Sequence, residues 1–223
     1  MYALGKIGVS WGGEQSSRSR PVLDALLLAV ERVAPSMDAV GLANTIWGLG
    51  KADTRWQGLP RSTQAALAAQ FQRLGNRLGP HAVSSALVGL VGMHSTWPLL
   101  QNSIRNSIET SIIRASVSEM NEQTVSMTLW GLAALKANRG SVQQQCFTRL
   151  FEGFVSTGGL LTSQGLCSAL YGLSVLGWGW EELPAQVTVT FESFCVNSKR
   201  FGLSYARLII HTFPLIFLSC PQW

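Results

Sequence analysis

The chain has 223 residues, of which 47% are hydrophobic and only 13% are charged, and its formal net charge is +5. A chain of this length and composition can form either one domain with a large core or a continuous array of stacked repeats. Because charged residues are few, most of its polar surface must consist of Ser, Thr, Asn and Gln. The basic balance permits an anionic partner such as RNA but does not require one.

Five related segments recur along the chain at a nearly constant spacing of about 41 to 45 residues. Their most constant position, here called the anchor, is followed by Gly-Leu in the last four copies. Nine positions after the anchor, four of the five copies carry Trp. The anchors are Tyr2, Trp47, Val88, Trp130 and Tyr171, and the later positions hold Trp11, Trp56, Trp97, Arg139 and Trp180. Four tryptophans in one register indicate a true repeat.

Each repeat predicts two helices. The first contains the anchor, begins after a capping residue and carries apolar residues at i, i+4 and i+7, as Leu42, Ile46 and Leu49 do. The predicted caps are Asp38, Gly79, Asn121 and Thr162. The second helices are predicted in the segments Arg20–Pro35, Leu59–Leu78, Leu99–Val117, Ser141–Val155 and Leu183–Val196. The β-branched run VTVTF in the last of these favours a strand locally, but its register in the repeat favours a helix.

The segment Leu203–Phe217 aligns as a degenerate last repeat that Pro214 interrupts. The apolar run from Leu208 to Cys220 is too short to span a bilayer, so we expect a buried helix and no membrane span. The N-terminus shows neither a signal-peptide nor a transit-peptide pattern.

Two helices in about 41 residues, neither of which can bury its apolar face alone, predict an all-α protein: a single α-solenoid domain over residues 1–223 with about five helix-hairpin repeats. Small residues at the positions of Gly41, Thr45 and Gly48 should let neighbouring helices approach closely. We expect the anchor aromatics and the later tryptophans to pack in the core between repeats, and base stacking is the alternative.

Polar side chains vary on one face of the first helices, which is typical of a surface that reads RNA. Those that could hydrogen-bond bases are Asn44, His81, Gln123, Gln164 and Ser168. Basic residues recur where these helices end, at Lys6, Lys51, Arg55, His94, Lys136 and Arg139, and the second helices add Arg61 and Arg105 among others. The alternatives are an ordinary solvated face and cations that stabilise helix C-termini.

Nothing in the sequence suggests catalysis. The three histidines are not within metal-ligand spacing of one another, and no nucleophile or phosphate-binding motif occurs. The four cysteines, Cys146, Cys167, Cys195 and Cys220, lie in separate segments and lack the close pairs of a zinc site. They are typical of buried thiols in a reducing compartment. We expect no enzyme activity, no cofactor and no metal.

The segments LANTIWGLGKADTRW (Leu42–Trp56) and VSMTLWGLAALKANR (Val125–Arg139) resemble the octotricopeptide repeat, and the resemblance covers residues 2 to about 217. It implies an α-solenoid that binds organellar RNA, either single-stranded or ribosomal, together with protein subunits of a ribonucleoprotein such as the mitoribosome. It implies a mitochondrial location, with a plastid as the alternative. The repeat is longer than the family's, and Gly replaces Ala after the anchor. A protein-binding scaffold of an organellar complex is the alternative function.

Overall fold

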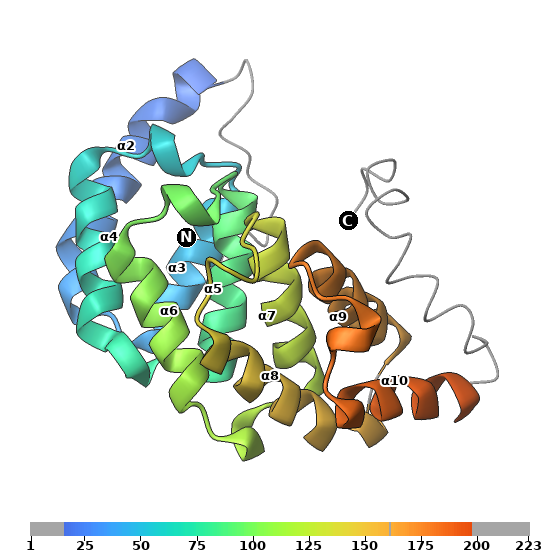
Figure 1. Cartoon of the computed structure of the whole chain (residues 1–223). Coiled ribbons are helices and arrows are strands. Elements are labelled where there is room, and N and C mark those ends of the chain that lie inside the picture. Colours follow the sequence, from blue (N-terminus) through green and yellow to red (C-terminus); the bar gives the residue numbers. More distant parts are fainter. Residues whose placement is uncertain (1–15, 161, 198–223) are drawn as a thin grey trace. The chain divides into compact units, whose positions relative to one another are not determined.

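The computed structural model describes residues 16–160 and 162–197, and within these ranges every regular element is helical (Figure 1). The all-α prediction is therefore confirmed. The chain divides into two compact units, Met1–Arg114 and Ala115–Trp223, and each is described by itself. The predictions for Tyr2, Lys6, Trp11 and the segment 203–217 fall outside the described residues.

The first unit has two rows of helices. Helices α2, α4 and α6 lie side by side in one row, and α3 and α5 pack together in the other (Figure 1). Contacts between α3 and α4 and between α5 and α6 join the rows. The bounds are α2 Ser16–Val33, α3 Ala39–Lys51, α4 Arg61–Leu74, α5 Pro80–Gly92 and α6 Asn102–Arg114, with short 3-10 turns before α3, α4, α5 and α6.

The second unit repeats this arrangement. Helix α7 packs against α9, α8 packs against α10, and α7 contacts α8. The bounds are α7 Glu122–Ala134, α8 Gln144–Ser156, α9 Ser163–Val175 and α10 Ala185–Asn197. Helices α7 to α10 follow α3 to α6 in the same order and at one constant offset, from Ala39 to Glu122 at the first pair and from Asn102 to Ala185 at the last. Each helical position in the second unit therefore has a counterpart two repeats earlier.

The N-terminal ends of the anchor helices follow the sequence prediction. Asp38, Asn121 and Thr162 each accept a hydrogen bond from the backbone N–H three positions later, at 2.7, 2.8 and 3.0 Å, so these predicted N-caps are confirmed. Gly79 caps without a side chain, and Pro80 takes the first helical position. Helices α4 and α6 are shorter than predicted, because 3-10 turns take up part of their predicted ends, whereas α2 begins four residues earlier than predicted, at Ser16.

A left-handed residue ends each of the four anchor helices. Asp53, His94, Lys136 and Gly177 have φ values of 55°, 51°, 59° and 91° and stand six positions after their anchors. The next residue donates its N–H to the Leu carbonyl five positions back, for instance Thr54 to Leu49 at 3.1 Å and Trp178 to Leu173 at 3.0 Å. This is the Schellman pattern of helix termination.

Glycine allows the anchor helices to approach closely. A Cβ atom on Gly89 of α5 would lie 2.6 Å from the carbonyl carbon and oxygen of Ile46 in α3, and one on Gly172 of α9 would lie 2.7 Å from the carbonyl carbon of Leu129 in α7. Both glycines directly follow the anchor, and both face the residue directly before the preceding anchor. The predicted role of a small residue at this position is confirmed.

The tryptophans divide into two classes. Trp56, Trp97 and Trp180, nine positions after the anchor, are only 2%, 0% and 4% exposed, as predicted. The anchors Trp47, Trp130 and Tyr171 are half-buried, so they are covered less fully than the prediction of a core position implies. Their place on the helix explains this. Trp47 is three positions from Asn44 and four from Lys51, which puts it on the same face as those polar residues.

Tertiary context overrides local propensity in α10, which is helical through VTVTF, as the register predicted. Cys146 is buried and Cys167 is half-buried. Burial raises the pKa of the Cys167 thiol.

Within residues 16–160 and 162–197, no helix has both the length and the apolar character to cross a bilayer.

Candidate functional site

Each anchor helix has one solvent-accessible side. It consists of the anchor and the residues seven and three positions before it and four after it, which are all exposed or half-buried. We call this the anchor face. It comprises Val40, Asn44, Trp47 and Lys51 of α3; His81, Ser85, Val88 and Gly92 of α5; Gln123, Met127, Trp130 and Ala134 of α7; and Gln164, Ser168, Tyr171 and Val175 of α9.

In the first unit this face combines an aromatic ring with a cation. The Nζ atom of Lys51 lies 5.6 Å from the centroid of the Trp47 ring, within cation–π range. Asn44 is half-buried on the same face of α3, and His81 is exposed on the neighbouring helix α5. The predicted residues Asn44, Lys51 and His81 therefore lie on two helices that pack together.

Of the basic residues at the ends of the first unit's anchor helices, one forms an ion pair with an acidic residue and the others do not. His94 Nε2 lies 2.9 Å from Asp53 Oδ1, and both occupy the left-handed position of successive repeats. Arg55, two positions after Asp53, is exposed and forms no ion pair within the described part of the chain. Lys51 and Arg55 are therefore the cations that remain accessible at this end of α3.

In the second unit the anchor face carries aromatic and amide groups. Trp130 and Tyr171 are half-buried on the packed helices α7 and α9. The predicted residues Gln123 and Gln164 lie near the starts of the same helices, and both are exposed. Lys136 stands at the left-handed position after α7 and is exposed. This unit thus presents hydrogen-bonding and stacking groups with a single exposed cation at the end of α7.

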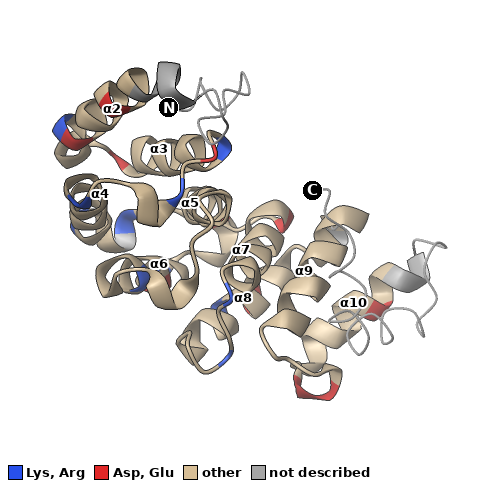
Figure 2. Ribbon diagram, turned by 90° about the horizontal axis from the view of Figure 1, so that it is seen from above, with Lys and Arg blue, Asp and Glu red and all other residues tan. Residues whose placement is uncertain are grey.

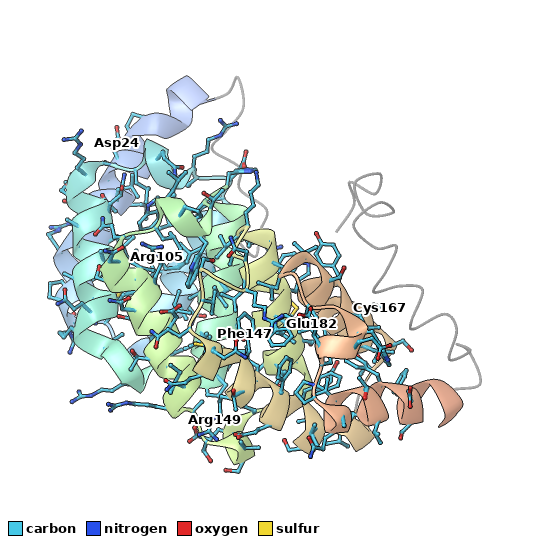
Figure 3. All side chains as sticks on the ribbon, viewed as in Figure 1. Asp24, Arg105, Phe147, Arg149, Cys167 and Glu182 are labelled. Atoms are coloured by element: carbon cyan, nitrogen blue, oxygen red, sulfur yellow. The ribbon has the colours of Figure 1, made fainter. Side chains whose placement is uncertain are left out.

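Arg139 is committed to contacts inside the second unit. Its Nη1 atom is 2.6 Å from Glu182 Oε1, and its guanidinium lies 4.0 Å from the centre of the Trp178 ring. The backbone N–H of Gly179 and the Arg139 guanidinium both donate to Glu182, which lowers the pKa of that carboxyl (Figure 3). Arg139 replaces the tryptophan of the other repeats, and the indole of Trp178 fills space at its side.

The lowered pKa of Glu182 predicts a pH-dependent contribution to stability. Because the folded-state pKa is depressed, the contribution is present above the unfolded pKa of about 4.3 and is lost as the pH falls through the lower folded pKa. Glu182→Gln should therefore lower the urea midpoint at pH 7, and its difference from the unaltered protein should shrink toward pH 3. Glu181→Gln, an exposed neighbour, is the matched control; an equal loss from it would contradict this role.

Two predicted cations lie on the other row of helices. Arg61 is exposed at the start of α4. Arg105, labelled in Figure 3, is half-buried on α6; its Nη2 donates to Asn102 Oδ1, and its buried Nε has no acceptor among the described residues. Arg73 is held by the carbonyl of Met37, to which it donates at 2.7 Å. The structure therefore does not bring Arg61 and Arg105 together with the anchor face.

Sequence reasoning did not predict that the anchor aromatics would be partly exposed to solvent. The available signal was their spacing: each stands three positions after one face residue and four before another. It also missed the contact of Arg139 with Trp178, for which the sequence offers only the replacement of Trp by Arg in one copy.

Charge is distributed unequally along the chain. Residues 1–114 contain eleven Lys and Arg against six Asp and Glu, whereas residues 115–223 contain six of each. The whole net charge of +5 therefore belongs to the first part of the sequence. Figure 2 shows where the charged residues of the described part lie along the ribbon. Among the residues that the structure describes, no three His, Cys, Asp or Glu side chains come together as a possible metal site.

No protein-family model, no curated protein and no solved structure matches this chain.

Proposed function

We propose that the chain is a non-catalytic RNA-binding helical-repeat protein. It is an α-solenoid with a period of about 41 residues, similar to octotricopeptide-repeat proteins. It acts in an organelle, mitochondrial in the first instance and plastid as the alternative. There it holds RNA, single-stranded or ribosomal, inside a larger ribonucleoprotein such as the mitoribosome.

The solenoid proposal is supported by contacts that recur in both units. The anchor helices begin at Ala39, Pro80, Glu122 and Ser163, a nearly constant spacing of about 41 residues. The N–H of Trp56 donates to the Met93 carbonyl at 2.9 Å, and the N–H of Arg139 donates to the Leu176 carbonyl at 2.9 Å. Donor and acceptor stand at the same repeat positions in each case. Equal contacts between successive repeats are what a stacked array requires.

The observation that carries the RNA proposal is the composition of the anchor face. It offers half-buried aromatic rings at Trp47, Trp130 and Tyr171, each with an amide side chain one or two turns earlier in its helix. Single-stranded RNA binds by stacking its bases on such rings, at about 1–3 kcal/mol per base, while cations hold the phosphates. Lys51 and Arg55 are placed to supply the cations in the first unit.

The alternative, a protein-binding scaffold, is favoured by a different feature. The second unit has no net charge over residues 115–223, and a groove beside α8 has an apolar floor of Phe151, Trp178 and Val187. This surface offers little to a phosphate backbone. A protein partner that stays bound at high salt and after nuclease treatment would favour this alternative.

The RNA proposal is tested by fluorescence anisotropy with a labelled single-stranded RNA of about 20 nucleotides. The expected result is binding whose logarithmic affinity falls linearly with the logarithm of salt concentration, with a slope of about −0.7 per phosphate neutralised. Absence of binding to any RNA at low salt would exclude the proposal. Crosslinking in the native complex, followed by sequencing of the attached RNA, tests the organellar assignment.

Variants on and off the anchor face should behave differently. The double substitution Lys51→Ala with Arg55→Ala removes two exposed cations and should reduce the salt slope by about 1.4. Trp47→Leu should weaken binding by about 1–3 kcal/mol, or five-fold and more, without changing the slope. Both are measured in the same anisotropy titrations.

The matched control is Arg61→Ala, which removes an exposed cation from the other row. We expect it to leave affinity and slope close to those of the unaltered protein. If Arg61→Ala weakens binding as much as the Lys51 and Arg55 change, the RNA does not follow the anchor face.

A further inference from the structure

The junction between helices α4 and α6, on the row of the first unit opposite the anchor helices, has a polar and basic surface. We propose that this junction binds the sugar–phosphate backbone of a base-paired RNA segment, while the anchor face binds single-stranded RNA. This second site rests on the proposed function, because it adds another class of RNA for the same protein. All of its residues belong to the first unit.

A cleft of about 320 Å³ lies between α4 and α6, which pack side by side (Figure 1). None of the side chains that line it is charged or apolar. They belong, together with one glycine, to Gln72, Gly75, Ser103, Asn106, Ser107 and Thr110. The amides of Gln72 and Asn106 are exposed to solvent. Hydroxyl and amide groups of this kind contact phosphate oxygens and ribose in nucleic-acid complexes.

Two arginines stand at one end of this cleft. The hydroxyl of Ser111 donates to the carbonyl of Gly75 at 2.7 Å, which fixes the end of α4 against the last turns of α6. Arg77 ends the 3-10 turn that begins at Gly75 and packs on α6. Arg114 follows Ser111 by about one helical turn. Both arginines are exposed, and neither has an ion-pair partner within the described part of the chain.

No acidic side chain of α4, the 3-10 turn or α6 offsets these cations at the surface. The sequence from Thr54 to Ile108 contains no Asp or Glu. Glu109, the one acidic residue of α6, is only 6% exposed. A phosphate that approaches the cleft from these elements therefore meets cations and hydrogen-bond donors without a competing carboxylate.

The second unit shows that the fold does not require this polarity. Three positions of the junction carry exposed apolar residues there: Val155 in place of Gln72, Leu160 in place of Arg77 and Val189 in place of Asn106. The last turns of α8 and α10 also contain no basic residue, so these helices end without a cation that would favour their dipole. The basic and polar junction is therefore a particular property of the first unit.

The composition of the junction favours paired RNA over a single strand or a protein. The one aromatic residue of α4 and α6, Phe71, is fully buried, so no ring is available for an unpaired base to stack on. Neither helix exposes a large apolar side chain, and such side chains anchor most protein interfaces. Paired RNA is bound chiefly through its phosphates and 2′-hydroxyls, which require only polar and basic groups.

The test is fluorescence anisotropy with a labelled, blunt RNA duplex of about 16 base pairs, the length that duplex-binding domains cover. An excess of unlabelled single-stranded RNA keeps the anchor face occupied during the titration. The expected result is duplex binding that survives this excess and whose logarithmic affinity falls linearly with the logarithm of salt concentration.

Two double variants place residues of the second unit at the corresponding positions of the junction. Arg77→Leu with Arg114→Asn removes both cations and should raise the dissociation constant at least about tenfold. It should also lower the salt slope by about 1.8, or about 0.9 per phosphate contact as for B-form DNA. Gln72→Val with Asn106→Val should weaken binding without changing the slope. The control Arg149→Ala removes an ion-paired arginine of α8 and should change neither.

Single-stranded RNA separates this second site from the proposed function. Both double variants should keep the unaltered protein's affinity for a single strand and its urea midpoint. Duplex binding that is absent at low salt, or that survives the loss of both arginines unchanged, overturns the second site, whereas the proposed function fails only if single-stranded RNA does not bind. Failure to bind the duplex, combined with binding of poly-glutamate through the same arginines, overturns it in favour of an acidic protein partner.

Discussion

Gly89→Ala and Gly172→Ala are each expected to lower the free energy of unfolding by about 2–4 kcal/mol, although Ala is the better helix former by about 1 kcal/mol. The reason is the close approach of paired anchor helices. The added methyl carbon would lie 2.6 Å from backbone atoms of Ile46 or 2.7 Å from those of Leu129, and a backbone cannot move aside as a flexible side chain can. The helices must separate, which opens the packing along their length.

Urea denaturation of each variant, followed by far-ultraviolet circular dichroism and tryptophan fluorescence, measures the loss. The control is Gly79→Ala. A Cβ there meets nothing within 4 Å, and the backbone φ of −67° suits any residue, so the change should cost only the difference between Gly and Ala as an N-cap, about 1 kcal/mol at most. A stabilising effect of Gly89→Ala, as expected for an isolated helix, would contradict the close contact between α3 and α5.

Repetition is the reason that so much of the fold could be predicted from one sequence. A single Trp-Gly-Leu segment is ambiguous, but four copies in register fix the helix that contains it and its capping residue. Asp38, Asn121 and Thr162 were predicted as caps because each precedes the same stripe of leucines. The glycine after the anchor was likewise predicted to lie at a helix contact because it recurs, and Gly89 and Gly172 do so.

The candidate site was harder to predict because exposure is a property of the packed helices. Large aromatic residues in a fixed register predict a core, and Trp56 and Trp97 follow that rule. Trp47 has the same residue type and the same regularity, yet neighbouring helices leave its side partly open. Only the spacing of Trp47 from the polar residues Asn44 and Lys51 distinguishes it from the buried tryptophans. A prediction based on residue type alone does not take that spacing into account.

Pairings between repeats were also not visible along the chain. His94 was grouped with the cations after the anchor helices, but in the fold it meets Asp53 of the preceding repeat. Arg139 was grouped in the same way and meets Glu182. Both pairs join residues separated by about one repeat, so a test of opposite charges one repeat apart would have found them.

Trp56→Ala and Trp47→Ala make the same chemical change nine positions apart, and we expect losses of stability that differ severalfold. Trp56 is 2% exposed, so its truncation leaves a large cavity and should lower the free energy of unfolding by about 3–5 kcal/mol. Trp47 is half-buried, so its truncation should cost about 1 kcal/mol. Urea denaturation of the two single variants, with Trp97→Ala as a second buried case, measures this difference.

The same pair of variants separates packing from binding. If bases stack on the anchor face, Trp47→Ala should lose RNA affinity while it keeps most of its stability. The Trp56→Ala protein, measured under conditions in which it is folded, should keep the RNA affinity of the unaltered protein. The Trp56 indole is covered in the fold, so it cannot contact a base. Equal stability losses would show that Trp47 belongs to the core after all, and unchanged RNA affinity of Trp47→Ala would show that its half-buried ring is not a stacking surface.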